Sequence, residues 1–196
     1  MEKPLNVFLL GRSGCGKGTQ VKLLKEKLLA NQKVYTSSTG DLLRELEQQQ
    51  TDVGIHLHGV LARGGLAPKA LAVSMWLHKM AWSLQNDEGM LFEGSPRSVW
   101  EAQGLDEVLA FLERDEYAHV IYIDVSAEEV KRRLIARGRQ DDTEASISSR
   151  LAFFEQDVKP VIEHYRAKGM LIEVNGEQSV EQVHEDIVQL LGLSNT

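Results

Sequence analysis

Glycines and a lysine with the spacing of a phosphate-binding loop are the strongest chemical signal in this sequence. The run Gly11–Thr19 reads GRSGCGKGT, follows the apolar residues Val7–Leu10 and opens a helix-like segment. Glycine permits a positive φ, which lets main-chain N–H groups approach phosphate oxygens. The following helix N-terminus favours an anion, and Lys17 adds a point charge. Strand, loop, helix and lysine together predict a site for a nucleoside triphosphate or a similar polyphosphate.

Two residues near this loop are candidate magnesium contacts. The usual pattern has Ser or Thr directly after the lysine, whereas here Gly18 follows and Thr19 comes next. Thr19 is therefore a candidate for a magnesium or phosphate contact. Glu93 ends the predicted strand Met90–Phe92, and its carboxylate could hold Mg²⁺ through water because hard cations prefer oxygen.

Basic residues gather in one short segment of an otherwise acidic chain. Residues 131–139 contain Lys131 and four arginines: Arg132, Arg133, Arg137 and Arg139. Arg133 and Arg137 are four residues apart, so a helix would place them on the same face. A guanidinium stays charged and binds phosphate bidentately, so this segment is a candidate phosphate clamp.

Acidic neighbours leave plainer roles open for parts of this segment. Glu128 and Glu129 precede Arg132 and Arg133 by four residues, the favourable order for surface ion pairs. We expect Arg132 on the solvent face, and the residues alone leave Arg133 open between a surface pair and a ligand contact. Asp141 and Asp142 could cap the helix that follows or take part in nucleotide binding, and both interpretations remain open.

Arg97 has the position of a residue that could bridge two phosphates. It follows Pro96 in a Gly-Ser-Pro loop directly after the predicted strand Met90–Phe92. Ligands bind at the carboxyl ends of strands in open parallel sheets. An ordinary loop arginine is the plainer alternative.

Short apolar runs alternate with helix-like segments along the chain. The predicted strands are Asn6–Leu10, Lys33–Thr36, Met90–Phe92, His119–Asp124 and Met170–Val174. The helices predicted after them are Lys17–Ala30, Asp41–Gln48, Val99–Glu113, Ala127–Arg137 and Val180–Leu191. This alternation predicts an α/β fold in which helices cover both faces of a parallel sheet.

Additional helical sequence lies outside this simple alternation. The stretches Leu42–Leu61 and Pro68–Leu84 separate the second and third strands, which is more chain than a crossover needs, so we expect a small helical flap there. A long helix is predicted over Thr143–Lys168, where the apolar positions keep to one face. Pro160 should kink this helix or end its first half.

Composition limits the class of protein. The chain has 196 residues, 42% of them hydrophobic, a net charge of −7 and one cysteine, Cys15. One compact domain fits this length, and the acidic charge argues against general binding to nucleic acid or to an anionic membrane. A lone cysteine allows no internal disulfide and no cysteine-based zinc cage. The run Val7–Leu10 is too short for a signal-peptide core or a membrane span, so we expect a cytoplasmic protein. No obvious apolar surface stripe is left over, so we expect a monomer.

Five motifs in order resemble the adenylate kinase family over nearly the whole chain. They are the loop ending Gly18-Thr19-Gln20, then Ser38–Arg44, Gly65–Pro68, Glu93–Arg97 and Arg137–Asp142. The resemblance implies a P-loop NTPase fold with three α/β/α layers and a five-stranded parallel sheet. It implies one domain over 1–196, with a flap that binds the monophosphate at about 36–68 and a short lid at about 133–143.

The resemblance also implies roles for individual residues. Contacts to ATP are implied for Gly14, Cys15, Gly16, Lys17, Gly18, Thr19, Arg133 and Arg137. Contacts to AMP are implied for Thr39, Gly40, Arg44, Ala67, Gly94, Arg97, Glu101, Arg139 and Arg150. Phosphoryl transfer is implied for Lys17, Arg97, Arg133, Arg139 and Arg150. The implied reaction is reversible transfer from MgATP to AMP, giving two ADP, and the short segment after Arg137 implies a lid without structural zinc.

Three positions depart from the family pattern. Glu93 stands where the family usually has Asp, and Ser95 stands where it usually has an aromatic residue. Glu101 occupies the position of the adenine-reading Gln. An ionised Glu only accepts hydrogen bonds, whereas Gln also donates. Thr39 favours AMP as the acceptor, but a kinase for CMP, UMP or GMP remains an alternative, and so does a nucleotide-binding protein without turnover.

Overall fold

The computed structural model describes residues 4–29, 32–63, 65–139 and 141–193. Its centre is a five-stranded sheet with the order β2-β3-β1-β4-β5, in which all neighbouring strands are parallel. The strands are β1 (Asn6–Leu10), β2 (Lys33–Ser38), β3 (Glu88–Glu93), β4 (Ala118–Asp124) and β5 (Leu171–Asn175). The predicted five-stranded parallel sheet is confirmed.

Strand boundaries differ from the prediction where polar residues extend the pairing. β2 continues through Ser37 and Ser38, which pair with Phe92 and Glu93 of β3. Apolar runs alone could not reveal this extension, because main-chain hydrogen bonds are indifferent to side-chain polarity. The added residues lie at the carboxyl end of the sheet.

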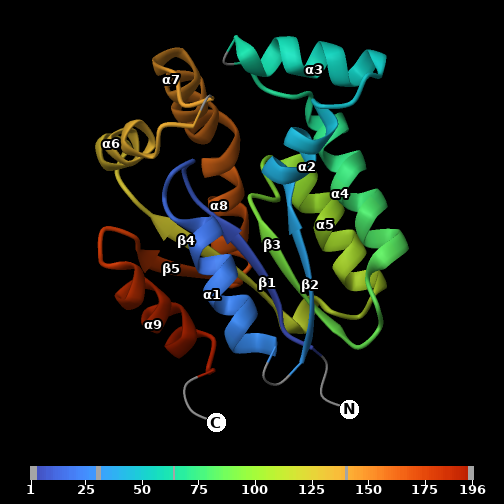
Figure 1. The fold of residues 1–196 in the computed structure, drawn as a ribbon. Helices are drawn as coiled ribbons and strands as arrows, with labels where there is room; N and C mark the ends of the chain where they lie inside the picture. The colour runs from blue at the N-terminus through green and yellow to red at the C-terminus, as the bar shows by residue number, and fades with distance from the viewer. Residues whose placement is uncertain (1–3, 30–31, 64, 140, 194–196) are drawn as a thin grey trace.

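Helices cover both faces of the sheet (Figure 1). They are α1 (Lys17–Leu29), α2 (Thr39–Leu46), α3 (Asp52–Ala62), α4 (Lys69–Ser83), α5 (Val99–Phe111), α6 (Ala127–Arg137), α7 (Glu144–Phe153), α8 (Lys159–Ala167) and α9 (Val180–Leu190), with a short 3₁₀ turn, η1, at Asp115–Tyr117. α1 packs against α9 on one face, and α4, α5 and α8 lie on the other. The three-layer architecture is confirmed. In the described part of the chain, no helix is long and apolar enough to cross a membrane.

Alternating side chains of the buried strands build two separate cores. All five residues of β1 are buried, as expected for a strand covered on both faces. Phe8 points to the core under α4, α5 and α8, where its ring centroid lies 5.3 Å from that of Phe92. Val7 and Leu9 point to the opposite core with α1, α6 and α9. These cores hold the carboxyl ends of the strands in place.

The predicted helical stretch Leu42–Leu61 is divided in the structure. α2 ends at Leu46, and α3 begins at Asp52. Thr51 stops a continuous helix because its extended backbone and its side chain, which accepts from the Gly54 N–H at 3.1 Å, cap the new helix. The predicted end of the first helix, Ala30, and Gln140 within the Arg137–Asp142 motif lie outside the described residues.

The predicted long helix is interrupted next to Pro160, as expected. α7 leads into a π-helical turn, η2 (Phe154–Val158), and α8 begins at Lys159. The Lys159 N–H bonds to the Phe154 carbonyl, one residue farther back than in an α-helix. Proline has no N–H and its ring crowds the carbonyl four residues earlier, so a wider turn relieves the clash.

Candidate nucleotide-binding site

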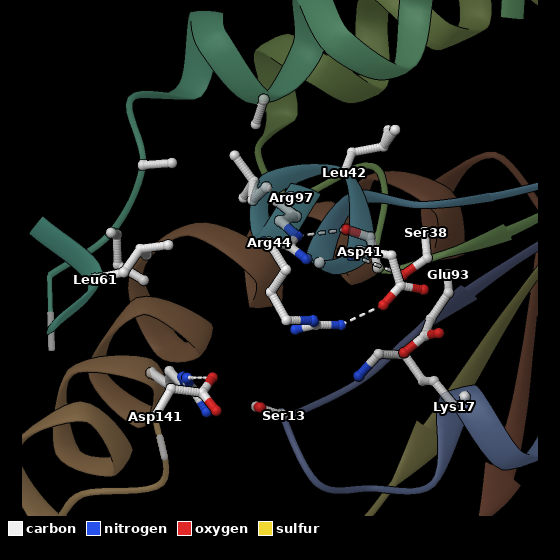
Figure 2. A pocket seen from close by; sticks show the side chains of 18 of the residues that line it. Ser13, Lys17, Ser38, Asp41, Leu42, Arg44, Leu61, Glu93, Arg97 and Asp141 are labelled. Carbon is white, nitrogen blue, oxygen red and sulfur yellow. Dashed lines mark hydrogen bonds and ion pairs between the residues drawn. The ribbon is translucent and has the colours of Figure 1, made fainter. Parts of the chain in front are cut away.

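A cavity of about 1790 Å³ opens at the carboxyl ends of the strands. Its walls come from the phosphate loop, the end of β3, the α2–α4 region and the α6–α7 segment. Figure 2 shows Lys17, Glu93 and Arg44, from three different elements, around the same hollow. The volume exceeds the roughly 300–1,000 Å³ typical of a site for one small ligand, so there is room for two nucleotides.

The phosphate loop joins β1 to α1 and has the backbone that its glycines predicted. Gly14 has φ +89° and Gly16 has φ +105°, in a region that other residues rarely adopt. A Cβ on Gly14 would also lie 2.9 Å from Leu134 Cγ. Lys17 Nζ donates to the carbonyls of Gly11 at 2.8 Å and Arg12 at 2.9 Å, which holds the ammonium at the loop.

Gly18 lies so close to the Glu93 carboxylate that there is little room for a side chain at position 18. A Cβ on Gly18 would lie 3.3 Å and 3.4 Å from the two carboxylate oxygens of Glu93. A serine or threonine at this position would therefore press on the carboxylate. Thr19 is exposed in the first turn of α1 and lines the cavity together with Glu93. Hydroxyl and carboxylate oxygens suit Mg²⁺, so these residues fit a magnesium ion that arrives with a triphosphate.

Arg97 and Glu101 are hydrogen-bonded to each other and both lie in the cavity wall. Arg97 Nε donates to the Gly94 carbonyl at 2.5 Å, and burial lowers the pKa of Arg97 from its very high usual value. Glu101 is 3% exposed and accepts from Trp76 Nε1 at 2.9 Å and from the Arg97 main-chain N–H at 2.8 Å. Burial raises the pKa of Glu101, although these two donors partly offset the rise.

The α2 helix brings Arg44 to the opposite wall. Ser38 caps α2 by accepting from the Asp41 N–H, and Arg44 Nη2 donates to Asp41 at 2.5 Å. Burial alone would raise the pKa of Asp41, but the bond and charge of Arg44 outweigh it, so the pKa lies below its usual value. The Thr39 hydroxyl instead turns inward to a buried hydrogen bond with Ser95.

Asp142 joins two arginines at the α6–α7 side of the cavity. Its carboxylate accepts from Arg137 Nε at 2.9 Å and Nη2 at 2.7 Å, and from Arg150 Nη1 at 3.1 Å. Asp141 accepts from Arg150 as well. The helix-capping interpretation of these aspartates is wrong, because Thr143 caps α7 by accepting from the Ser146 N–H at 3.2 Å.

We expect Asp142→Asn to lower the free energy of unfolding by about 2 kcal/mol at pH 7, because charged hydrogen bonds to two arginines are lost. Burial acts to raise the pKa of Asp142, but the bonds from Arg137 prevail and the pKa is depressed. Its contribution is therefore full above the unfolded value of about 3.9 and disappears as pH falls through the folded pKa. Chemical denaturation of both proteins between pH 7 and pH 3 measures this difference.

The matched control for that prediction is Asp87→Asn. Asp87 pairs with Lys33, but both side chains are more than half exposed. Because solvent screens this pair, it contributes little to the free energy of unfolding. A loss in Asp142→Asn that equals the loss in Asp87→Asn, or that persists unchanged below both pKa values, contradicts the assigned role of Asp142.

The two neighbouring arginines on α6 behave differently. Arg132 is 72% exposed and bonds to Glu129, which confirms the predicted solvent-face residue. Arg133 donates to Glu129 at 2.7 Å and to the Gly176 carbonyl at 3.0 Å, and it also lines the cavity. Bonds from Arg132 and Arg133 lower the pKa of Glu129 to about 2. Arg133 thus forms the ion pair with Glu129 and also lies at the cavity wall.

The structure brings most of the predicted site residues to the cavity wall. These are Gly14, Gly16, Lys17, Gly18, Thr19, Gly40, Arg44, Ala67, Glu93, Gly94, Arg97, Glu101, Arg133, Arg137, Arg139 and Arg150. Cys15 and Thr39 do not line it. The Cys15 thiol is 2% exposed and belongs to the core between the sheet and α1, so its side chain does not line the cavity.

Sequence reasoning missed two partners that hold these residues. Asp142 was considered only as a cap or a ligand contact, although three arginines within eight residues of it signal a need for a counter-charge. Trp76 was expected only to pack, although a buried indole N–H needs an acceptor and Glu101 is that acceptor. Both sets of bonds form between neighbouring elements, α6 with α7 and α4 with α5, and so depend on how the helices pack.

Known proteins with similar sequences place the chain in a family. The family model described as Adenylate kinase matches residues 9–170. An adenylate kinase of Azobacteroides pseudotrichonymphae genomovar. CFP2 is 35% identical over 189 residues, covering 94% of this chain and 96% of that protein. One from Synechococcus sp. (strain JA-2-3B'a(2-13)) is 37% identical over 190 residues, covering 94% and 95%.

The similarity extends to a third relative and to the elements that build the cavity. Adenylate kinase 1 of Nostoc sp. (strain PCC 7120 / SAG 25.82 / UTEX 2576) is 33% identical over 186 residues, covering 95% of this chain and 98% of that protein. The matched range 9–170 contains the phosphate loop, Arg97 and the α6–α7 arginines. With this fold, this cavity and this extent of similarity, the chain belongs to the adenylate kinase family.

Proposed function

We propose that this protein transfers the terminal phosphoryl group of MgATP reversibly to AMP, giving two ADP. The observation that supports this best is the cavity itself, where a phosphate loop with Lys17 faces arginines from three other parts of the chain. The family membership supports the same reaction. Phosphoryl transfer needs placement and charge neutralisation, which this arrangement supplies.

On the donor side, main-chain N–H groups of the loop from Gly14 to Thr19 hold the ATP phosphates. Lys17 leaves the Gly11 and Arg12 carbonyls and follows the transferred group, since its ammonium is a mobile point charge. Thr19 and Glu93 hold Mg²⁺, the latter through water. When bound, the ion would supply positive charge that neutralises the phosphates.

On the acceptor side, Arg44 and Arg97 hold the phosphate of AMP between Gly40 and Gly94. An oxygen of that phosphate attacks the terminal phosphorus of ATP, a new P–O bond forms, and the bond to the ADP leaving group breaks. No side chain forms a covalent bond. Arg139 and Arg150 neutralise the charge that shifts to the leaving oxygen.

Several arginines must exchange a carboxylate for a phosphate before transfer. Arg44 is paired with Asp41, while Arg137 and Arg150 are paired with Asp142. We assign residues of about 36–68 to a flap that closes over AMP and residues of about 133–143 to a short lid that closes over ATP. Closure excludes water, which strengthens each arginine–phosphate contact.

Glu101 reads the adenine base in this proposal. An ionised carboxylate accepts from the adenine amino group but repels the adjacent ring nitrogen, whereas a protonated carboxyl both donates and accepts, like the amide of Gln. Burial raises the pKa of Glu101, so the proton needed for this pairing is more readily available there than on an exposed glutamate.

An ADP-formation assay with MgATP and AMP, CMP, UMP or GMP tests the proposal. We expect kcat/KM for AMP to exceed that for each other acceptor by at least roughly tenfold, a difference of about 1.4 kcal/mol. In the same assay, Glu101→Gln should keep or improve AMP use, since the amide supplies the donor and the acceptor without a proton. Equal use of another acceptor contradicts the assignment to AMP, and nucleotide binding without turnover would identify a binding protein.

The proposal includes a monomer in the cytoplasm whose partners are the nucleotides ATP, AMP and ADP. The net charge of −7 supports the exclusion of nucleic acid, because a general nucleic-acid surface is basic. Magnesium is the only metal in the proposal, because the lone cysteine gives no zinc cage in the lid.

A further inference from the structure

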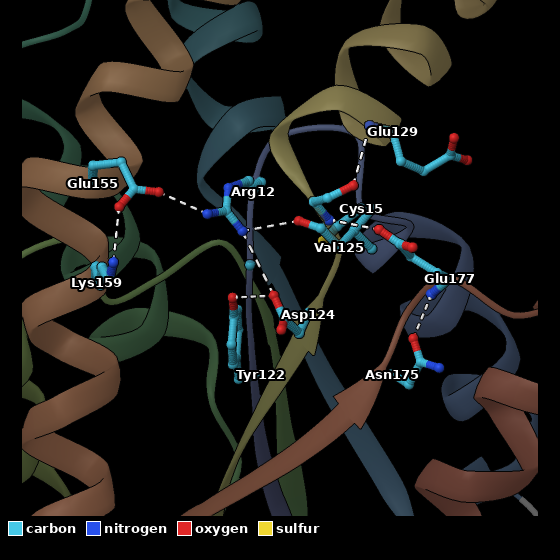
Figure 3. Close-up of polar contacts among 12 residues, drawn as sticks. Arg12, Cys15, Tyr122, Asp124, Val125, Glu129, Glu155, Lys159, Asn175 and Glu177 are labelled. Atoms are coloured by element: carbon cyan, nitrogen blue, oxygen red, sulfur yellow. Dashed lines mark hydrogen bonds and ion pairs between the residues drawn. The ribbon is translucent and has the colours of Figure 1, made fainter.

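Arg12 is the one charged residue of the phosphate loop whose side chain turns away from the cavity. The cavity wall includes Gly11 and Ser13 on either side of it but not Arg12 itself. The guanidinium is 14% exposed and donates to the Val125 carbonyl at 2.9 Å and to Glu155 Oε1 at 2.6 Å. Figure 3 shows this side chain between the end of β4 and the helix that carries Glu155.

Beyond the loop, Arg12 contacts the end of β4 and the π-helical turn η2, which carries Phe154 and Glu155. Its Cζ lies 4.2 Å from the centroid of the Phe154 ring, within cation–π distance. Phe154 in turn stacks on Tyr122 at 6.2 Å, and the Tyr122 hydroxyl donates to Asp124 at 2.5 Å. Arg12 Nη1 is also 3.6 Å from Asp124. The guanidinium thus joins the loop to η2 through Glu155 and the face of Phe154, and to the end of β4 through the Val125 carbonyl.

The turn η2 continues directly from the helix that presents Arg150 to the cavity. Arg150 lies four residues before Phe154, so one helical turn separates them. On its other side, the Arg12 main-chain carbonyl accepts from Lys17 Nζ at 2.9 Å. Arg12 therefore contacts Lys17 through its main chain. Through its side chain it contacts η2, the turn that directly follows the helix α7 with Arg150.

We propose that Arg12 is a positioning residue. It couples binding of the donor nucleotide by the phosphate loop to the placement of Arg150. The inference rests on the proposed function. In-line transfer needs Lys17 and Arg150 in register, and small displacements of such groups are costly. A guanidinium suits this link, because its planar fork can bond a carbonyl and a carboxylate while one face lies on a ring.

The kinetic test is a double-mutant cycle between Arg12 and Arg150. Arg12→Lys keeps the charge and loses the fork, so we expect kcat to fall about tenfold in the wild-type background. In the Arg150→Ala background the same change should have almost no further effect, because the coupled group is gone. Equal factors in the two backgrounds overturn the proposal.

The matched control variant is Lys159→Met. Lys159 pairs with the same Glu155 from the solvent side at 3.1 Å and is 58% exposed. It should leave kcat within about twofold of wild type, as surface changes usually do. Glu155→Gln is the second test variant, which weakens the link from the other side and guards against misfolding of Arg12→Lys. A loss of kcat in Lys159→Met as large as that in Glu155→Gln contradicts the proposed link.

A second readout needs no turnover and separates this inference from the proposed function. Hydrogen exchange of residues 141–153 is measured with and without a non-hydrolysable MgATP analogue. We expect the analogue to protect this segment in the wild-type protein and to protect it much less in Arg12→Lys at saturating analogue. Equal protection in both proteins overturns the coupling, whereas the expected difference without any ADP formation sustains the coupling and refutes only the proposed reaction.

Discussion

Lys17→Ala should lower kcat for ADP formation by roughly 100- to 1,000-fold, the usual cost of removing one preorganised group that stabilises transition-state charge. Lys17 Nζ lies at the loop, held by the Gly11 and Arg12 carbonyls, from which it can reach the transferred phosphoryl group. The change removes a part-buried ammonium from the cavity wall and no core contact, so we expect the protein to stay folded. Steady-state kinetics together with thermal unfolding measure both results.

Lys33→Ala is the control for this change. Lys33 begins β2 at the opposite end of the sheet, and its side chain is 70% exposed in a pair with Asp87. It should keep the wild-type rate. A near-normal kcat in Lys17→Ala, with Lys33→Ala also normal, would remove the phosphate loop from the reaction.

Arg97→Lys should lower kcat/KM by about 100-fold, because the charge remains but the planar fork that orients two phosphates is lost. Arg97 Nε is bonded to the Gly94 carbonyl and the residue is half-buried, so its other nitrogens have a defined direction. Lysine cannot reproduce this bond and the ligand contacts together. Initial rates at varied ATP and AMP will show whether both substrates are affected, as expected for a residue between them.

Arg132→Lys applies the same chemical change at a surface position. Arg132 is 72% exposed on α6 and bonds to Glu129. The kcat/KM of the Arg132→Lys variant should stay within about twofold of wild type. If Arg97→Lys were as mild as Arg132→Lys, Arg97 would have to be an ordinary loop arginine, which is the alternative that its sequence allowed.

Some features of the fold were predictable because they depend on residues close in sequence. Apolar runs separated by amphipathic segments predicted five parallel strands, and β1 has the predicted bounds Asn6–Leu10. The bounds of α6, Ala127–Arg137, were also predicted, since Ser126 caps its start and Gly138 ends it with φ +63°. Caps and periodic patterns are local signals, so a sequence expresses them directly.

Other features depended on contacts between distant parts of the chain. No local signal indicated that Thr39 would bond to Ser95, that the Cys15 thiol would be buried, or that Trp76 would donate to Glu101. The spacing of Asp142 and its arginines was visible, but their mutual bonding required α6 and α7 to pack side by side. These hydrogen bonds and the burial of the thiol depend on which side of each helix or strand faces the core.

The sequence by itself determined the phosphate loop, the arginines and the parallel α/β architecture, because glycine spacing, charge and apolar periodicity act over a few residues. Only the tertiary structure decided which charges pair, which side chains reach the cavity, and that Arg12 turns from the loop to Phe154 and Glu155. Those outcomes depend on the balance between burial and hydrogen bonding for groups on different elements, such as Arg12 and Glu155. That balance is set only once the layers have packed.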